Sequence, residues 1–274
     1  MALFDTHAHL DDDQIAPIIG EVLKQAESSG LCAITAIGTT VESSKQCLEL
    51  AKKYSAKASS QTEQQSEPKV NVYASVGIHP NKCKDSDEED WAAIAELATR
   101  DQVVAIGETG LDRYWDYCPI EIQEKWFARH IELSFQTEKP LVIHMRDCEA
   151  DILRVLDQHK KNDRIIGIMH SFAGSWETAQ QCLELGMYIS FAGMVTFKKS
   201  NDLRHIASRI PDDRILVETD SPYLSPHPHR SVRPNQPAMV EHTARCIAEV
   251  RGMGFDDFAD LTTANAKTVF GLTG

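Results

Sequence analysis

The chain has 274 residues, a formal net charge of −13 at pH 7 and 42% hydrophobic residues. This length fits one large domain or two small ones and allows a sizeable buried core. The acidic balance argues against a generally basic surface that coats nucleic acid. A polyanionic substrate remains compatible with this charge if metal ions and a few arginines create a local positive site.

The cysteines and the N-terminus indicate the compartment. Seven cysteines are scattered along the chain without a Cys-x-x-Cys pair, which favours free thiols in a reducing compartment over a disulfide framework. Near the N-terminus, Asp5 and the acidic run 11–13 stand where a signal peptide would be basic and apolar, and no apolar run is long enough to span a membrane. We therefore expect a cytoplasmic protein without membrane association, and the sequence indicates no obligate protein partner.

Short apolar runs alternate with amphipathic stretches along the chain. Near-continuous apolar runs are typical of parallel strands that are covered on both faces. The strands are expected at residues 2–5, 31–37, 70–76, 103–106, 141–143, 165–169, 187–190 and 215–217. Helical patterns occupy residues 18–26, 91–98, 122–135, 152–156, 179–185 and 203–210, and two more, at 239–250 and 255–270, follow a proline-rich loop.

The repeated strand–helix order defines the fold class. About eight repeats, in a chain near the roughly 250 residues typical of the fold, predict an α/β protein with a (β/α)8 TIM-type barrel. We expect a single domain over residues 1–274. The alternative is an open doubly wound sheet, and the lack of a Gly-rich phosphate turn after the first strand argues against it. The polar, Ser/Gln-rich segment at about residues 56–69 is interpreted as a surface insertion.

Polar residues follow the ends of the expected strands. His7 and His9 lie one residue apart, so both project from the same side of an extended chain, where they can bind one metal ion. In a barrel the carboxyl ends of the strands form one rim, and active sites are built there. Each residue taken singly also fits a buried histidine or a turn, but recurrence at equivalent places predicts convergence. The later residues in this pattern are His79, Glu108, His144, His170 and Asp220.

The motifs around these residues resemble those of the TatD family of metal-dependent hydrolases, within the amidohydrolase superfamily. The matching stretches span nearly the whole chain and are DTHAHL (5–10), GIHP (77–80), GETGLD (107–112), PLVIHMRDC (140–148), HSFAG (170–174), ETDSPYL (218–224) and RPNQP (233–237). The resemblance implies a barrel with a two-metal site. On that basis one metal is bound by His7, His9 and Asp220, Glu108 bridges, and the second metal is held by His144 and His170.

The chemistry of these side chains agrees with the implied site. Mixed imidazole and carboxylate ligands suit several divalent ions, and we expect two ions chosen from Mg, Mn or Zn. Two metals close together lower the pKa of a bound water and clamp the attacking and leaving oxygens. Asp220 is the candidate to orient that water and accept its proton, and Glu108 is the second catalytic carboxylate.

Substrate contacts are expected from positive or hydrogen-bonding groups in the surrounding loops. Arg146 lies two residues past His144 and shares its direction on an extended strand. Family members often carry an aromatic residue directly after Gly-Leu-Asp, whereas here Arg113 precedes Tyr114 and Trp115. These two rings either stack on the bases of a single strand or cover the rim. The full set of candidates is Arg146, His79, Arg113, Arg233 and Asn235.

The resemblance implies a metal-dependent deoxyribonuclease that acts on single-stranded DNA or 3′ ends, in the manner of a 3′-5′ exonuclease. Two alternatives use the same two-metal site, namely a D-aminoacyl-tRNA deacylase and a small-molecule amidohydrolase. A non-catalytic metal-bound module is disfavoured, because the ligand set is complete.

Overall fold

The computed structural model describes residues 2–55 and 68–272, and in these residues eight parallel strands follow one another in sequence order. The predicted TIM-type barrel is confirmed. Residues 56–67 of the expected insertion lie outside the described residues. The strands are β1 (Leu3–Ala8), β2 (Leu31–Ile37), β3 (Asn71–Val76), β4 (Val103–Asp112), β5 (Leu141–Arg146), β6 (Gly167–Met169), β7 (Tyr188–Phe191) and β8 (Ile215–Val217).

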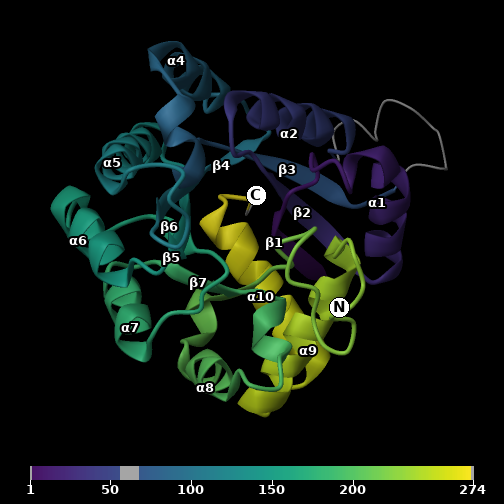
Figure 1. Ribbon diagram of the computed structural model, residues 1–274. Coiled ribbons are helices and arrows are strands. Elements are labelled where there is room, and N and C mark those ends of the chain that lie inside the picture. Colours follow the sequence, from purple (N-terminus) through teal and green to yellow (C-terminus); the bar gives the residue numbers. More distant parts are fainter. Residues whose placement is uncertain (1, 56–67, 273–274) are drawn as a thin grey trace.

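Helices surround the sheet, as Figure 1 shows looking onto the carboxyl ends of the strands. Their bounds are α1 (Ile19–Ser28), α2 (Val41–Lys53), α4 (Glu88–Leu97), α5 (Ile120–Thr137), α6 (Glu149–His159), α7 (Trp176–Glu184), α8 (Asn201–Arg209), α9 (Val240–Arg251) and α10 (Phe255–Val269). The sequence did not indicate α2, because its buried face is built mainly from small residues such as Ser44, Cys47 and Ala51. The Thr40 hydroxyl, which accepts from the Ser43 backbone N–H, caps its first turn.

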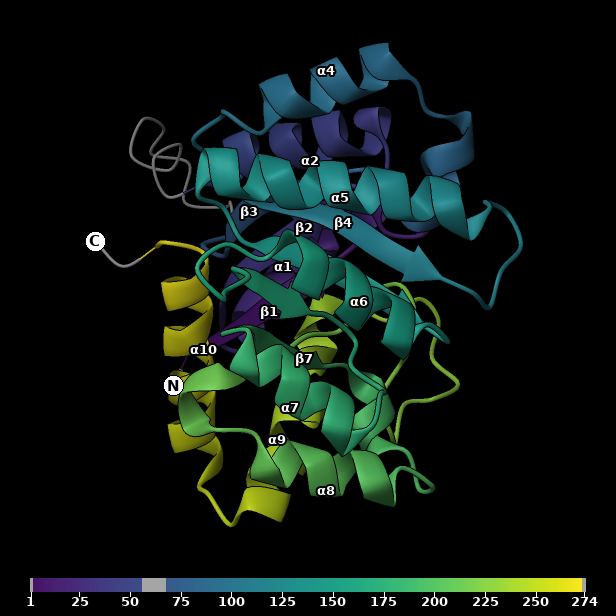
Figure 2. The ribbon, with the colours of Figure 1, turned by 90° about the vertical axis from the view of Figure 1, so that its left-hand side faces the viewer.

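The helix α10 closes the amino end of the barrel. A buried cluster joins its residues Ala266, Val269 and Phe270 to side chains from six strands, among them Phe4 of β1 and Val142 of β5. Side chains from β1 and β5, which are far apart around the sheet, meet only through the barrel interior. In Figure 2, α10 lies across the end opposite to the arrowhead of β4. The carboxyl end is therefore left for a site.

The strand β4 is longer than predicted and carries the GETGLD motif within the sheet. It runs to Asp112 and pairs with β5, with Gly110 opposite His144. The polar ends of these strands gave no apolar signal, so the sequence placed both strand ends too early. Gly107 and Gly110 have φ values of +142° and +130°, and a Cβ on Gly110 would lie 2.1 Å from the His144 carbonyl oxygen. Only glycine fits these two positions without displacing β5.

The barrel closes between β1 and the residues that follow β8. Ala8 and Ser221 form a parallel bridge. The Asp220 N–H donates to the His7 carbonyl oxygen at 2.9 Å, and the His9 N–H donates to the Ser221 carbonyl oxygen at 2.8 Å. These backbone hydrogen bonds fix the positions of three predicted metal ligands, His7, His9 and Asp220, relative to one another.

All seven cysteines are free thiols, and five of them are buried. Within residues 2–55 and 68–272, no helix combines the length and the apolar character needed to cross a membrane.

The closure by α10 yields a stability prediction. Phe270 is 5% exposed and its ring centroid lies 5.6 Å from that of Phe4. We expect Phe270→Ala to lower the free energy of unfolding by about 3 kcal/mol, because it leaves a cavity in the interior cluster. Urea denaturation measures this change. Val250→Ala, at an exposed position of α9, is the control and is expected to change stability by less than about 0.5 kcal/mol. Equal stability of both variants would contradict the assigned packing.

Candidate metal centre

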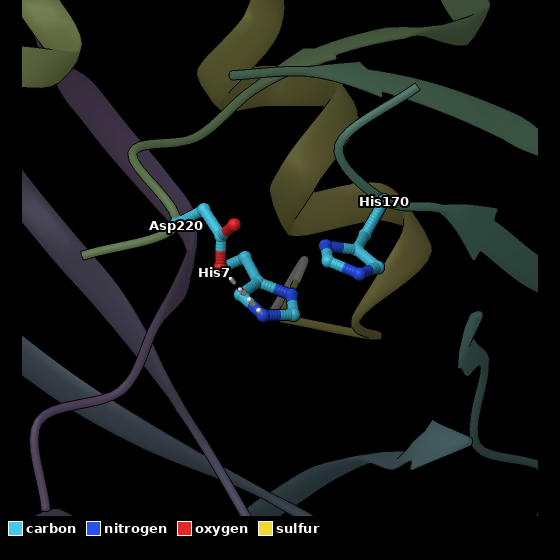
Figure 3. A group of neighbouring side chains, drawn as sticks. All are labelled: His7, His170 and Asp220. Carbon is cyan, nitrogen blue, oxygen red and sulfur yellow. Dashed lines mark ion pairs between the residues drawn. The ribbon is translucent and has the colours of Figure 1, made fainter. Parts of the chain in front are cut away.

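Four predicted ligands meet at the seam of the barrel. Asp220 Oδ1 lies 3.6 Å from His7 Nε2 and 3.5 Å from His9 Nε2. Glu108 Oε2 lies 3.6 Å and 3.7 Å from the same two nitrogens, which are 3.3 Å apart. Figure 3 shows His7 facing Asp220 while His170 enters from the other side. These donor atoms form the first group.

The other oxygen of Glu108 belongs to a second group. Glu108 Oε1 lies 2.9 Å from His170 Nε2 and 3.1 Å from His144 Nδ1, and these two nitrogens are 3.4 Å apart. The His170 ring also stacks on that of His7, with centroids 4.0 Å apart. The two oxygens of one carboxylate thus face two separate sets of imidazole nitrogens.

The donor set fits divalent metal ions. Four ligands arranged tetrahedrally at about 2.1 Å from an ion lie about 3.4 Å from one another. The donor distances of the first group, 3.3–3.7 Å, agree with this value. Groups of three ligand atoms that could hold an ion include His7, His9 and Glu108 in this group. The residues would hold one ion in each group, with Glu108 shared between them.

Buried carboxylates support the ligand rings from outside. His144 Nε2 lies 3.0 Å from Asp112 Oδ2, and His170 Nδ1 lies 3.2 Å from Glu218 Oε1. Such partners set the tautomer and orientation of a ligating imidazole. Asp5 acts on the backbone instead, since it accepts from the His7 N–H and the Thr219 N–H. The supporting carboxylates thus lie on β4, on β1 and directly after β8.

The pKa values of the carboxylates and imidazoles in the centre follow from these contacts. Burial alone would raise the pKa of Glu108, but the imidazoles, His170 first among them, hold it well below its ordinary value. Burial alone would lower the pKa of His170, but the carboxylates of Glu108 and Glu218 raise it well above its ordinary value. The Glu108 carboxylate and the imidazoles around it thus stabilise each other's charged forms.

His79 belongs to the same centre but differs in its protonation. Its Nε2 lies 3.5 Å from Glu108 Oε1, and burial lowers its pKa to about 3, so the ring is neutral. Its Nδ1 accepts the Asn81 backbone N–H at 3.1 Å. Because that nitrogen is an acceptor, the proton of the neutral ring lies on Nε2. His79 therefore presents an N–H donor to the centre, as suits the predicted substrate contact.

A cavity of about 1120 Å³ opens above both groups. Of the predicted substrate contacts, His79 and Arg146 line it. The sequence reasoning missed two lysines of its wall, Lys82 and Lys84, which lie in the short helix η2 (Pro80–Asp85). Their signal was present, because both directly follow the GIHP motif at the end of β3.

The other three predicted contacts do not line this cavity. Arg113 Nε donates to Asp151 at 2.6 Å, on the outside of the rim. Arg233 donates to the Ser225 hydroxyl and to neighbouring carbonyl oxygens. Asn235 is fully buried, and its amide donates to the carbonyl oxygens of Thr219 and Tyr223. It fixes the loop that carries Asp220, which is a positioning role.

Comparison with known proteins identifies the family of this chain. A family model described as "TatD related DNase" matches residues 4–271. The chain belongs to the TatD family. It is 38% identical over 268 residues to the "uncharacterized metal-dependent hydrolase YabD" of Bacillus subtilis, covering 98% of both chains. The chain is thus a metal-dependent hydrolase of this family, as its motifs predicted.

Two further relatives bear on activity and fold. The chain is 31% identical over 275 residues to the "3′-5′ ssDNA/RNA exonuclease TatD" of Shigella flexneri, covering 98% of this chain and 99% of that one. The crystal structure of YJJV, a TatD homologue from Escherichia coli K12, superposes with a TM-score of 0.86 at 24% identity and covers 98% of both chains. That structure shows the same fold.

The shared carboxylate predicts how metal content responds to substitution. We expect Glu108→Ala to lose both ions and His9→Ala to lose one, because each Glu108 oxygen faces a different group. Metal analysis after reloading with Mn or Zn measures the number of ions per chain. Glu184→Ala, which removes an exposed carboxylate on α7, is the control. Retention of one ion by Glu108→Ala would show that the carboxylate is not shared.

Metal affinity is expected to rise with pH. Burial would lower the pKa of His9, but the hydrogen bond to Asp220 and the charges of Glu108 and Asp220 raise it to about 9. Below that pH a proton occupies the ring and must leave before the nitrogen can bind an ion. Affinity should therefore increase from about pH 6 to about pH 9, by about ten-fold per pH unit for each proton displaced. Calorimetry in two buffers of different ionisation enthalpy counts the protons released, and a pH-independent affinity would refute the assignment.

Proposed function

We propose that this chain is a phosphodiesterase that removes nucleotides from the 3′ ends of single-stranded DNA. The observation that carries the proposal is the Glu108 carboxylate, shared between two groups of imidazoles at the floor of an open cavity. A carboxylate shared in this way would hold two ions close together, and such a pair suits in-line displacement at phosphorus. The name of the Shigella flexneri relative, a 3′-5′ ssDNA/RNA exonuclease, supports this substrate class.

Two divalent ions held by His7, His9, Asp220, His144, His170 and the shared Glu108 would supply the electrophilic part of the chemistry, by polarising a phosphoryl oxygen and lowering the pKa of a water. We propose two ions, with Mn or Zn favoured over Mg by the four imidazoles. Their positive charge matters for binding, because the cavity wall carries several carboxylates, including Asp11, Asp12 and Asp147.

We assign the proton transfer and the binding of the phosphate to side chains of the protein. The side chain of Asp220 is 14% exposed, whereas that of Glu108 is 3% exposed. Asp220 is therefore the carboxylate that water can reach, and we assign it to orient the attacking water and hold its proton. Glu108 keeps its role as the shared ligand. His79 donates from Nε2 to an oxygen of the phosphate, and Arg146, Lys82 and Lys84 offset the charge of the strand.

We also propose that this chain works in a reducing compartment. Seven free thiols, five of them buried, are the usage expected of a protein in a reducing compartment such as the cytoplasm.

The role of Asp220 yields the central test. We expect Asp220→Asn to lower kcat on a 3′-labelled DNA single strand by about 10³-fold or more, since the amide cannot accept the proton. The fold should persist, as measured by circular dichroism and thermal melting. Cleavage is followed on denaturing gels after loading with Mg, Mn or Zn.

A substrate panel provides the control for this test. The wild-type chain is assayed in parallel on the DNA strand, on a D-aminoacyl-tRNA and on small amides. Full activity of Asp220→Asn would remove its assigned role. Hydrolysis of the aminoacyl ester or of an amide, without cleavage of DNA, would replace the proposed function with one of the alternatives.

A further inference from the structure

Exposed aromatic rings gather at the mouth of the metal cavity. Among the described residues, the large hydrophobic side chains left exposed include Tyr114, Trp115 and Tyr117, at 53%, 42% and 57%. These three lie within four consecutive positions after β4, and Trp115 and Tyr117 line the cavity together with His144. Apolar surface concentrated in this way beside a site is typical of a binding surface.

The rings form an ordered stack. Trp115 and Tyr117 stack with their centroids 5.3 Å apart and their planes 12° from parallel. The guanidinium carbon of Arg146 lies 3.8 Å from the centroid of the Tyr114 ring, which meets Trp115 edge-on. We call Trp115 and Tyr117 the aromatic platform. The outer face of such a stack suits a further stacked nucleobase, and the guanidinium of Arg146, 5.8 Å from the Trp115 ring, suits a phosphate next to that base.

Asp112 connects this platform to the metal centre. Its Oδ1 accepts the backbone N–H groups of Tyr114 and Trp115, at 2.9 Å and 3.0 Å. Its Oδ2 lies 3.0 Å from His144 Nε2 and accepts the Asn81 side-chain amide at 3.1 Å. One buried carboxylate thus holds both a metal-ligand ring and the start of the aromatic loop. The start of the loop that carries the platform therefore has a set position relative to His144.

We propose that the aromatic platform binds one unpaired nucleobase of the strand whose phosphodiester lies at the metal centre. The inference rests on the proposed function and adds the feature that selects single strands. A base inside a duplex has both faces covered by its neighbours, so only an unpaired base can lay a face on Trp115. Stacking on a ring accepts every base, which fits cleavage without sequence preference.

Binding measurements separate this role from catalysis. The wild-type chain loaded with Mn is titrated with a fluorescent oligothymidylate whose phosphorothioate linkages slow cleavage, and anisotropy gives Kd. We expect Trp115→Leu to weaken binding by about ten-fold, and Trp115→Phe, which keeps a flat ring, to retain most of the affinity. Thermal melting of each variant shows whether the fold is intact.

A matched set of strands identifies the stacked base. An abasic residue is moved one position at a time from the 3′ end. At one position the wild-type chain should lose about ten-fold in affinity, and Trp115→Leu should lose nothing further there. The same sequence as a duplex should bind more weakly and show no dependence on Trp115.

The outcomes distinguish the two proposals. If the wild-type chain cleaves DNA but the abasic scan is flat, or Trp115→Leu binds as tightly as wild type, the platform is not a base site and the inference is overturned. Equal losses by Trp115→Leu on intact and abasic strands, together with a lower melting temperature, would assign the ring to packing and also overturn it. If the wild-type chain neither binds nor cleaves DNA, the proposed function itself fails.

Discussion

The Glu108 carboxylate, buried between two groups of imidazoles, is the interaction on which the rest of the site depends. An anion so removed from water is costly unless cations surround it. The neighbouring imidazoles offset this charge, and in return the carboxylates of Glu108 and Glu218 raise the pKa of His170 well above its ordinary value. An ion bound to these imidazoles would displace their protons. Metal affinity is therefore expected to depend on pH. The two oxygens of Glu108 face different groups of imidazoles.

The barrel supplies the rigidity that this arrangement needs. The seam between β1 and the residues after β8 fixes His7, His9 and Asp220 by backbone hydrogen bonds, and α10 closes the opposite end. Asp112 extends this rigidity to the aromatic loop, because its Oδ1 accepts the backbone N–H groups of Tyr114 and Trp115. The candidate ligands thus lie on strands or shortly after strand ends, whereas the proposed base contact lies on a loop that is hydrogen-bonded to Asp112.

Much of the fold and of the site was predictable, because the signals are local. Apolar runs gave the strands, and motifs at their ends gave ligands that the structure brings together. The helix α2 was not predicted, because its buried face is only weakly apolar. The carboxyl ends of β4 and β5 were not predicted either, because their residues are polar and give no apolar signal. Arg113 and Asn235 lie near the motifs in sequence, yet their side chains bond to Asp151 and to loop carbonyl oxygens away from the cavity.

The sequence by itself determined the barrel, the family and the chemical types of the candidate metal ligands, since strand periodicity and motif spacing depend on neighbouring residues. Only the tertiary structure decided which oxygen of Glu108 faces which group, that the proton of His79 lies on Nε2, and that Trp115 lines the cavity. These features depend on side-chain directions and on contacts between segments far apart in the chain. Such contacts exist only once the strands have closed into a barrel.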